Sequence, residues 1–310
     1  MSGIKRTIGF TLSSLFVGIV IVFFAFSLWK QWQDGIIGSF TYPVAPLFIS
    51  MIGMIGLILF MALLWRQILI SLTKKRFHLG PIFRIHLLSW LGRYAPGKIG
   101  LLLGKLLLGS KLGLSKTVIV SSVIYEHLFF ISSGLSVVLI FLGPDAISRL
   151  APLELSPIAI MILILGIIIS IPFFIKAGFG LIRKIMKRYG NSQNVSVPMY
   201  KAIGFFAGYH ITHLSAGLGF YVLINALVPD HGIGILDAIG ILAAAHLSGI
   251  LVFFVPAGLG VRESVMTLLL VPYMGVETAL SISILARIWS MTADASLLLV
   301  LPLFGIKNRT

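Results

Sequence analysis

The sequence contains no cysteine and few charged residues. The absence of cysteine excludes disulfides, thiolate metal sites and cysteine nucleophiles. Only 11% of the 310 residues are charged and 58% are hydrophobic, whereas soluble domains carry about 25% charged residues. This balance excludes a soluble globular protein, and the amount of apolar surface excludes a disordered chain. The composition is typical of a polytopic membrane protein.

Acidic residues are especially scarce. There are 9 Asp and Glu against 24 Lys and Arg, so the net charge is +15. In a soluble protein this excess would suggest nucleic-acid binding, but in a membrane protein it is typical of cytoplasmic loops that face anionic lipids. We therefore expect membrane lipids with anionic headgroups, and not nucleic acid, as partners.

Six stretches are long and apolar enough to cross a bilayer, which takes about 20 residues. In chain order they are Ile8–Leu28, Ala45–Ile70, Thr117–Leu142, Pro157–Lys176, Lys201–Val228 and Glu277–Gly305. The first follows Lys5 and Arg6 as a signal peptide would, but its apolar run exceeds the usual length of about 7–15 residues. We expect it to be retained as a transmembrane helix.

Two further apolar regions are interrupted by proline and glycine. Region 81–110 is broken by Ala95-Pro96-Gly97 into pieces of about a dozen residues, which reach roughly 18 Å in a core of about 30 Å. Region 236–272 is broken by Pro256-Ala257-Gly258-Leu259-Gly260. Both patterns are typical of re-entrant helical hairpins buried in protein. The alternative for the second region is that its first piece, Leu236–Val255, spans the membrane fully.

The basic residues are unevenly distributed. With the N-terminus inside and each hairpin returning to its own side, the cytoplasmic side receives 20 of the 24 Lys and Arg residues. This asymmetry follows the positive-inside rule and predicts a cell-membrane protein with both termini in the cytoplasm. A fully spanning Leu236–Val255 would move Lys307 and Arg309 outside, which the rule disfavours.

The order span, span, hairpin, span occurs twice. Three spans per half is an odd number, so the second half would be inverted relative to the first. The breaks at Pro96 and Pro256 are separated by the same interval in the sequence as the span starts Thr117 and Glu277. We expect six full spans plus two re-entrant hairpins, all α-helical, in two inverted repeats, residues 1–150 and 151–310. The alternative is that proline and glycine merely kink long helices.

The first break lies in Arg93-Tyr94-Ala95-Pro96-Gly97-Lys98. Proline favours the first position of a helix, so a half-helix is expected to start near Pro96 with its free N–H groups aimed into the protein. Such a start attracts anions, and the flanking cations suit a phosphate. The alternative is that both cations reach the cytoplasmic headgroups. The candidate binding residues here are Arg93, Pro96, Gly97 and Lys98.

The second break lies in Pro256-Ala257-Gly258-Leu259-Gly260-Val261-Arg262-Glu263. Its glycines permit positive φ and close approach before a new helix. Glu263 falls in the first turn, where an acidic side chain also stabilises the helix dipole. Arg262 lies at membrane depth and requires Glu263 or a ligand as its partner. The candidate binding residues here are Pro256, Gly258, Gly260, Arg262 and Glu263.

Three more charged residues lie within predicted spans. Glu126 is in the third span, and Arg287 and Asp294 share one face of the sixth. By the interval that separates the two breaks, Glu126 corresponds to Ala286, beside Arg287. We therefore expect Glu126 and Arg287 to meet near the axis that relates the halves. Such a pair could gate a path or could be a structural ion pair.

His210 and His213 form an H-x-x-H motif in the fifth span. A metal site needs further ligands at matching spacing, and the sequence offers none, so packing or hydrogen bonding is expected. Gly204 and Gly208 of the same span predict close packing against another helix of this chain. Neither a P-loop nor a Ser-His-Asp pattern is present, so no cofactor, metal or catalytic residue is expected.

The R-Y-x-P-G-K element, the P-x-G-x-G-x-R-E element and the acidic residue between them resemble the flippase-like membrane family that includes the transmembrane region of lysylphosphatidylglycerol synthase. The resemblance extends over nearly the whole chain, implies an inverted-repeat lipid translocator, and points to the residues selected above from Arg93 to Arg287. The family often has Glu-Arg where this chain has Glu126-His127. The soluble aminoacyl-transferring domain of the synthase members is absent from the sequence, so lysyl transfer is not expected.

Together these features predict a transporter that moves a lipid with an anionic or aminoacylated headgroup between leaflets, and not an enzyme. Three alternatives stay open: an integral lipid-modifying enzyme, a membrane subunit that recruits a soluble enzyme through its basic loops, and a small-solute transporter of the same architecture. The sequence makes no prediction of the oligomeric state, the lipid or the energy source.

Overall fold

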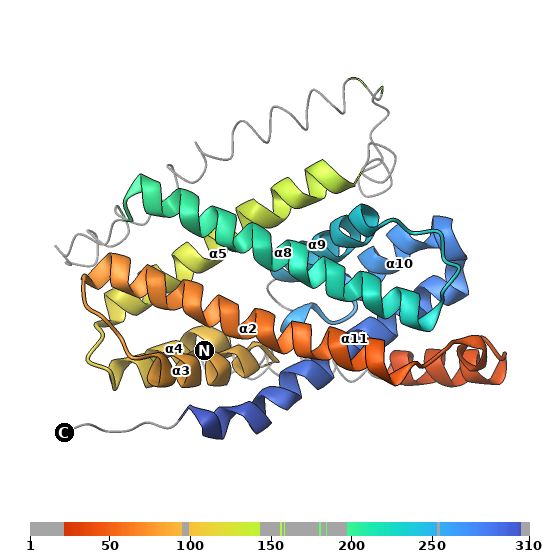
Figure 1. Cartoon of the computed structure of the whole chain (residues 1–310), viewed down its shortest axis with the longest axis horizontal. Coiled ribbons are helices and arrows are strands. Elements are labelled where there is room, and N and C mark those ends of the chain that lie inside the picture. The colour runs from red at the N-terminus through yellow and green to blue at the C-terminus, as the bar shows by residue number, and fades with distance from the viewer. Residues whose placement is uncertain are drawn as a thin grey trace, which may run out of the picture.

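The structure is a computed structural model that describes residues 22–94, 99–142, 197–252 and 255–304, with single positions at 156, 158, 180 and 184. Within these residues the chain is helical and contains no strand (Figure 1). An all-α fold is therefore confirmed for the described part of the chain.

The described helices occur in the same order of lengths in each half. After a helical segment over residues 22–33, the first half has α2 (Val44–Thr73), α3 (Leu79–Leu91), α4 (Ile99–Ser110) and α5 (Lys116–Phe141). The second half has α8 (Met199–Leu227), α9 (Ile235–Leu251), α10 (Val261–Met274) and α11 (Val276–Val300). Each half thus contains a long helix, two short helices and a second long helix.

Short 3-10 turns mark the interruptions between these helices. Turn η1 (Ile37–Ser39) precedes α2, η2 (Gly92–Tyr94) follows α3, η4 (Pro256–Gly258) precedes α10 and η5 (Leu301–Leu303) follows α11. Turn η4 coincides with the start of the second predicted break, and η2 ends immediately before the first, Ala95-Pro96-Gly97, which lies outside the described residues.

The ends of the helices have local causes in the sequence. Ser115 caps α5, because its side chain accepts a hydrogen bond from the N–H of Val118 at 3.3 Å. Lys74 ends α2 in the left-handed conformation, with φ of 60°. Gly275 separates α10 from α11 with φ of 77°, a conformation that costs glycine little.

Among the residues that the structure describes, three helical stretches are long and apolar enough to cross a membrane: Val44–Thr73, Lys116–Phe141 and Val261–Leu303. The third contains both α10 and α11, and the 25 residues of α11 would suffice by themselves. Helix α8 has 29 residues and therefore the necessary length, about 43 Å, but its two histidines and Lys201 make it less apolar.

The predicted spans at 45–70, 117–142, 201–228 and 277–305 coincide with α2, α5, α8 and α11 to within a few residues. Predicted span 157–176 and most of predicted span 8–28 lie outside the described residues. Helix α9 has 17 residues and reaches about 26 Å. It is therefore short for a bilayer core, which disfavours the fully spanning alternative for Leu236–Val255.

Each pair of short helices forms a hairpin. Helix α3 packs on α4, and α9 packs on α10. Glycine permits close approach in both hairpins: a Cβ on Gly92 would lie 2.6 Å from the carbonyl of Gly100, and a Cβ on Gly258 would lie 2.6 Å from Cα of Gly249. We call α3–α4 the first hairpin and α9–α10 the second hairpin.

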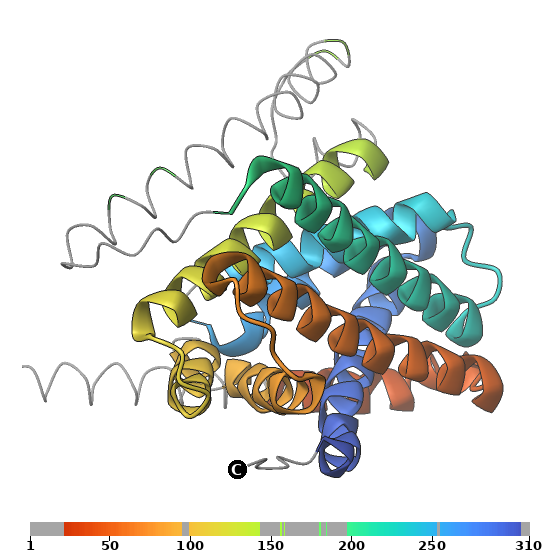
Figure 2. The same cartoon turned by 60° about the vertical axis from the view of Figure 1, so that its left-hand side comes forward.

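Helices at the same place in the order of the two halves make similar contacts. Helices α2 and α8 pack antiparallel, and the N–H of Thr41 donates to the carbonyl of Leu227 at 3.0 Å where one helix begins and the other ends (Figure 1). Helices α5 and α11 also run in opposite directions (Figure 2). Helix α5 packs on α8 and α9, and α11 correspondingly packs on α2 and α3.

The two breaks meet in the interior of the fold. Turn η2 of the first hairpin contacts η4 of the second, although the two turns belong to different halves of the chain. The two large apolar clusters of the described helices are built mainly on α2, α5 and α8, and on α5, α8, α9 and α11. The fold therefore brings the polar residues of both breaks to one place within an apolar protein.

Candidate functional site

Asp294 on α11 accepts hydrogen bonds from three side chains of the first hairpin and its turn. Trp90 donates from Nε1 to Oδ1 at 2.8 Å, and the Tyr94 hydroxyl and the Arg93 guanidinium both donate to Oδ2. Asp294 is only 2% exposed. One buried carboxylate thus joins the first hairpin to the last helix of the other half.

The Arg93 guanidinium is also enclosed by aromatic rings. Its Cζ lies 4.3 Å from the ring centroid of Trp90 and 5.3 Å from that of Tyr94. Cation–π attraction of this kind adds to the charge-assisted bond with Asp294. Arg93 is consequently held in place from three directions.

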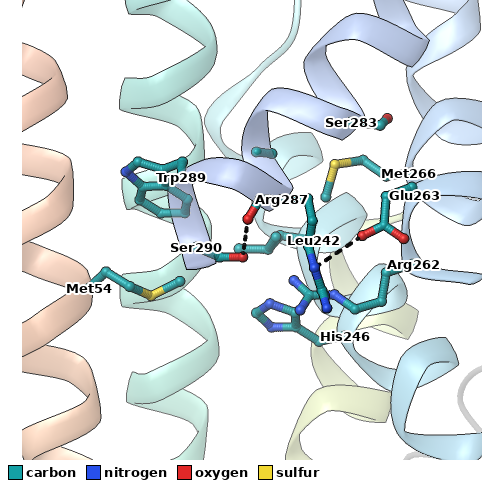
Figure 3. A pocket seen from close by; sticks show the side chains of 11 residues that line it. Met54, Leu242, His246, Arg262, Glu263, Met266, Ser283, Arg287, Trp289 and Ser290 are labelled. Carbon is teal, nitrogen blue, oxygen red and sulfur yellow. Dashed lines mark hydrogen bonds and ion pairs between the residues drawn. The ribbon is translucent and has the colours of Figure 1, made fainter. Parts of the chain in front are cut away.

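Arg287, two helical turns before Asp294 on α11, faces the second break. Its Nη1 donates to the carbonyl of Ala257 at 3.1 Å, and its Nε lies 3.6 Å from Oε1 of Glu263. Oε2 of Glu263 accepts the N–H of Gly260 at 2.7 Å. Glu263 therefore caps the start of α10 and pairs with Arg287 at the same time (Figure 3).

Arg262 and His246 lie beside this pair (Figure 3). Arg262 is 9% exposed and packs against the backbone of Gly249, where a Cβ would come within 2.5 Å of its Cγ. Only a glycine at 249 leaves room for this arginine in its present position.

Each arginine of this region has a buried N–H group without a hydrogen-bond partner. These groups are Nε of Arg93, Nε of Arg262, and Nε and Nη2 of Arg287. Buried donors without acceptors cost free energy, of the order of 1–3 kcal/mol each. Their arrangement suits a ligand that supplies several anionic oxygen atoms.

We define the arginine site as Arg93, Arg262, Glu263, Arg287 and Asp294. Electrostatic interactions connect its arginines with one another, and Cζ of Arg287 lies 5.9 Å from the ring centroid of Tyr94. Three cations and two carboxylates leave one positive charge. Since α10 begins here after Gly260, its free N–H groups add further positive potential. The site favours an anion.

A small cavity lies at the arginine site, lined by His246, Arg262, Glu263 and Arg287 together with Met54 and Trp289 (Figure 3). The space open to the centre of a water molecule is about 10 Å³, which is enough for about one water. A phosphate-bearing headgroup does not fit this cavity without movement of the surrounding helices.

The structure brings most of the predicted site residues together. Arg93, Gly258, Gly260, Arg262, Glu263, Arg287 and Asp294 lie at or beside the arginine site, and Pro256 begins η4. Pro96, Gly97 and Lys98 lie outside the described residues, and the described part of α4 starts at Ile99. The half-helix start near Pro96 stays a prediction.

Glu126 lies elsewhere, and its predicted meeting with Arg287 is wrong. Oε2 of Glu126 accepts a charged hydrogen bond from Lys105, and Oε1 lies 3.8 Å from Nδ1 of His86. The physical reason is that α4 packs on α5 and brings its own base to the acid of α5, while Arg287 finds its acid on α10.

The sequence analysis did not select several residues that contact the arginine site or Glu126. Lys105 is a lone charge inside an apolar run, and the need of such a charge for a partner is a usable signal. His86 and His246 are separated by the same interval in the sequence as the two breaks, which is a second signal. Trp90 and Tyr94 carry no signal beyond their position next to Arg93.

The histidines of the H-x-x-H motif are used in helix packing. Nε2 of His213 is 3.0 Å from the carbonyl of Phe130, and Nε2 of His210 is 2.5 Å from the Ser136 hydroxyl. Both contacts join α8 to α5. The predicted hydrogen-bonding role is therefore confirmed.

Comparison with known proteins adds one positive finding. No curated protein matches the chain. The family model of the lysylphosphatidylglycerol synthase TM region matches residues 8–297, which include both hairpins and every residue of the arginine site. Because this match covers most of the 310 residues, the chain belongs to the family of the lysylphosphatidylglycerol synthase transmembrane region.

Proposed function

We propose that this protein is a membrane transporter that moves a lipid with an anionic or aminoacylated headgroup between leaflets. The observation that carries the proposal is the convergence of two buried arginines, Arg262 and Arg287, and the partly buried Arg93 where η2 contacts η4, each with a buried N–H group that has no hydrogen-bond partner. Family membership supports a lipid-related role, because the family is named for a protein of lysylphosphatidylglycerol synthesis. The headgroup would bind at the arginine site while the acyl tails stay in the bilayer.

In this proposal, residues 1–150 and 151–310 are inverted repeats in the cell membrane, with both termini in the cytoplasm. The hairpins would enter from opposite leaflets as re-entrant elements. The repeated order of helix lengths and the opposite directions of α2 and α8 support this arrangement. Rocking of one repeat against the other would expose the arginine site to each leaflet in turn.

The described conformation would be the occluded one. Its cavity holds about one water, and Asp294 holds the first hairpin through Trp90, Arg93 and Tyr94. Entry of a headgroup would require Arg93 to leave Asp294. The same movement would release a guanidinium that can bind phosphate.

Both carboxylates of the arginine site, Asp294 and Glu263, already have hydrogen-bond or ion-pair partners, and this favours transport over lipid modification. Asp294 is engaged by three donors, and Glu263 is engaged by Arg287 and the N–H of Gly260. Carboxylates occupied in this way serve poorly as general acid or base, because a catalytic group must reach the proton it transfers. The proposal therefore assigns no chemical step to the protein.

A lipid-translocation assay in proteoliposomes tests the proposal. Headgroup-intact fluorescent phosphatidylglycerol and lysylphosphatidylglycerol, labelled on an acyl chain, are followed by dithionite quenching of the outer leaflet. The wild-type protein is expected to move labelled lipid from the inner to the outer leaflet, where dithionite quenches its fluorescence. Arg262→Gln should slow this by about tenfold or more, since loss of one charge-assisted bond is worth about 1.5–3 kcal/mol. Arg76→Gln, at an exposed arginine, is the matched control.

The outcomes separate the candidate functions. Movement of neither lipid above protein-free vesicles would rule out the proposed transport. Appearance of a new lipid species on a chromatogram of the same vesicles would favour an enzyme instead. Equal rates for Arg262→Gln and Arg76→Gln would remove the arginine site from the mechanism.

A further inference from the structure

A second buried ionic cluster lies outside the arginine site, where α5 meets the first hairpin. Lys105 of α4 donates a charged hydrogen bond to Oε2 of Glu126 on α5, and Nδ1 of His86 on α3 lies 3.8 Å from Oε1. Nζ of Lys105 also lies 4.4 Å from the ring centroid of Trp65 on α2. We call His86, Lys105 and Glu126 the Glu126 cluster.

The Glu126 cluster is sealed from its surroundings. The exposed fractions are 1% for Lys105, 1% for His86 and 5% for Glu126. An ion pair at this depth is maintained by the attraction between its members, and removal of either partner leaves a buried charge that costs about 3–5 kcal/mol. The charge state of Glu126 therefore depends on where Lys105 is.

Polar atoms without partners surround the pair. Neither ring nitrogen of His86 forms a hydrogen bond, and the buried hydroxyl of Tyr209 on α8, which interacts electrostatically with Glu126, also lacks one. A histidine always carries at least one N–H, and a hydroxyl can either donate or accept. Nδ1 of His86, 3.8 Å from Oε1 of Glu126, is too far for a direct hydrogen bond, so a proton would reach Glu126 from these atoms through a water or after a small side-chain shift.

Among the described residues, the titratable groups that interact with Glu126 come from α3, α4, α5 and α8. Helix α4 contributes Lys105, α3 contributes His86, α8 contributes Tyr209, and α5 itself contributes His127. Helix α2 presents Trp65, which does not titrate. The histidine of α9, His246, interacts instead with the arginines and with His213. Lys105 is thus the cation in contact with Glu126.

The Lys105–Glu126 pair connects α4 to α5, and any movement of the first hairpin relative to α5 changes this contact. Lys105 is on the hairpin and Glu126 is on the long helix, just as Glu263 and Arg287 bridge α10 and α11 in the second half. If α4 moved away from α5, Glu126 would lose its cation while α2, α8 and α9 stayed packed on α5 and kept it from water. A buried carboxylate without a cation binds a proton, because burial disfavours the charged form.

We infer that Glu126 is a proton-binding site whose occupancy is coupled to separation of the first hairpin from α5, which makes the transporter proton-coupled. One proton from the aqueous phase binds a carboxylate oxygen of Glu126 as the Lys105–Glu126 pair opens. The proton leaves when Lys105 returns, so charge and proton balance over the cycle. The inference rests on the proposed function for its coupling to transport, whereas the proton-linked movement of the hairpin stands independently.

Spin-label distances test the proton-linked movement without any lipid substrate. The chain has no cysteine, so Leu103→Cys on α4 and Ile203→Cys on α8 provide two unique sites for spin labels. Leu103 is 47% exposed and Ile203 is 64% exposed. The distance between the two labels is measured in nanodiscs from about pH 4 to about pH 8. The population with the longer distance should rise as pH falls. For one coupled proton the ratio of the two populations changes by up to about tenfold per pH unit.

Variants identify the titrating group. Glu126→Gln should abolish the pH dependence, whereas Glu277→Gln, the same change at an exposed carboxylate in the first turn of α11, should preserve it. If Glu126→Gln does not give monodisperse protein, Lys105→Met tests the same link and should also abolish the response in this range. A wild-type distance that does not change with pH, or a full response in either cluster variant, would overturn the inference.

The test is distinguishable from that of lipid transport. A pH-dependent distance that requires Glu126, in a protein that fails to move either fluorescent lipid, would uphold the proton site and reject the proposed cargo. Lipid movement without a pH-dependent distance would support the proposed lipid transport and reject the proton site at Glu126.

Discussion

At the scale of single residues, Asp294 connects α11 to the first hairpin and its turn. Its carboxylate satisfies an indole, a phenol and a guanidinium from the opposite half of the chain. An asparagine of the same shape can accept from Trp90 or Tyr94, but it cannot neutralise Arg93. The substitution therefore separates the role of charge from the role of shape.

Asp294→Asn is expected to lower the free energy of unfolding by about 3 kcal/mol, because it leaves a largely buried arginine without its carboxylate. The measurement is equilibrium unfolding in mixed micelles. Asp34→Asn, at an exposed residue of a turn, is the control. A loss within about 0.5 kcal/mol of that control, the range of ordinary surface substitutions, would show that the pair contributes little.

The sequence predicts which residues form the arginine site better than it predicts their partners. Charges at membrane depth need compensation, so Arg262, Arg287 and Asp294 stand out by their position. The partner of each depends on the rotation of helices that are far apart in the chain, which no local pattern encodes. Lys105 shows the limit clearly: counting charges assigns it to the cytoplasmic side, whereas it is buried against Glu126.

At the scale of helices, glycines decide how closely α8 can pack. A Cβ on Gly217 would lie 2.5 Å from Cα of Ile239 on α9, and a Cβ on Gly208 would lie 2.6 Å from a side-chain methyl of Leu64 on α2. A backbone atom cannot yield as a methyl group can. Gly217 is therefore the more demanding of the two positions.

Gly217→Ala is expected to lower the free energy of unfolding by about 1–3 kcal/mol, the usual cost of overpacking. Gly204→Ala on the same helix meets nothing within 4 Å and should be neutral or stabilising by up to about 1 kcal/mol. Thermal melting of the two variants in one detergent compares them. Equal stability of the two would mean that α8 and α9 are less tightly packed than described.

The helices themselves were largely predictable. Long apolar runs predict the positions of α2, α5, α8 and α11, and proline with glycine predicts the second break at η4. The residues of the first break, Ala95-Pro96-Gly97, lie outside the described part of the chain. The packing of α8 was predicted in part: Gly208 contacts α2 as expected, whereas Gly204 contacts nothing and Gly217 was overlooked. Contacts between helices depend on the facing surface, and the sequence of one helix does not specify that surface.

At the scale of the whole molecule, the hydrogen bond from Thr41 to Leu227 brings the start of α2 and the end of α8 to the same end of the bundle. Asp34 and Asp230 lie in the adjoining loops, and Lys75 lies beyond the opposite end of α2. With two inverted repeats, the loops that hold Asp34 and Asp230 would face outward, and the loop that holds Lys75 would face the cytoplasm.

Single cysteines at these three positions test that topology. Asp34→Cys and Asp230→Cys are expected to react with a membrane-impermeant maleimide on intact cells, and Lys75→Cys only after permeabilisation. The cysteine-free parent protein provides the blank. Labelling of Lys75→Cys and Asp230→Cys from one side would exclude the inverted arrangement.

The aromatic and carboxylate surroundings of Arg93 have a consequence for selectivity. Any headgroup that recruits this guanidinium competes with an internal acceptor that is already ionised and well oriented. The apparent affinity is reduced by the small fraction of molecules in which Arg93 is free. In the proposed mechanism, neutral sugar or glycerol headgroups would offer no comparable acceptor and would leave Arg93 bound to Asp294. Asp294 would then act as a filter against headgroups that accept hydrogen bonds weakly.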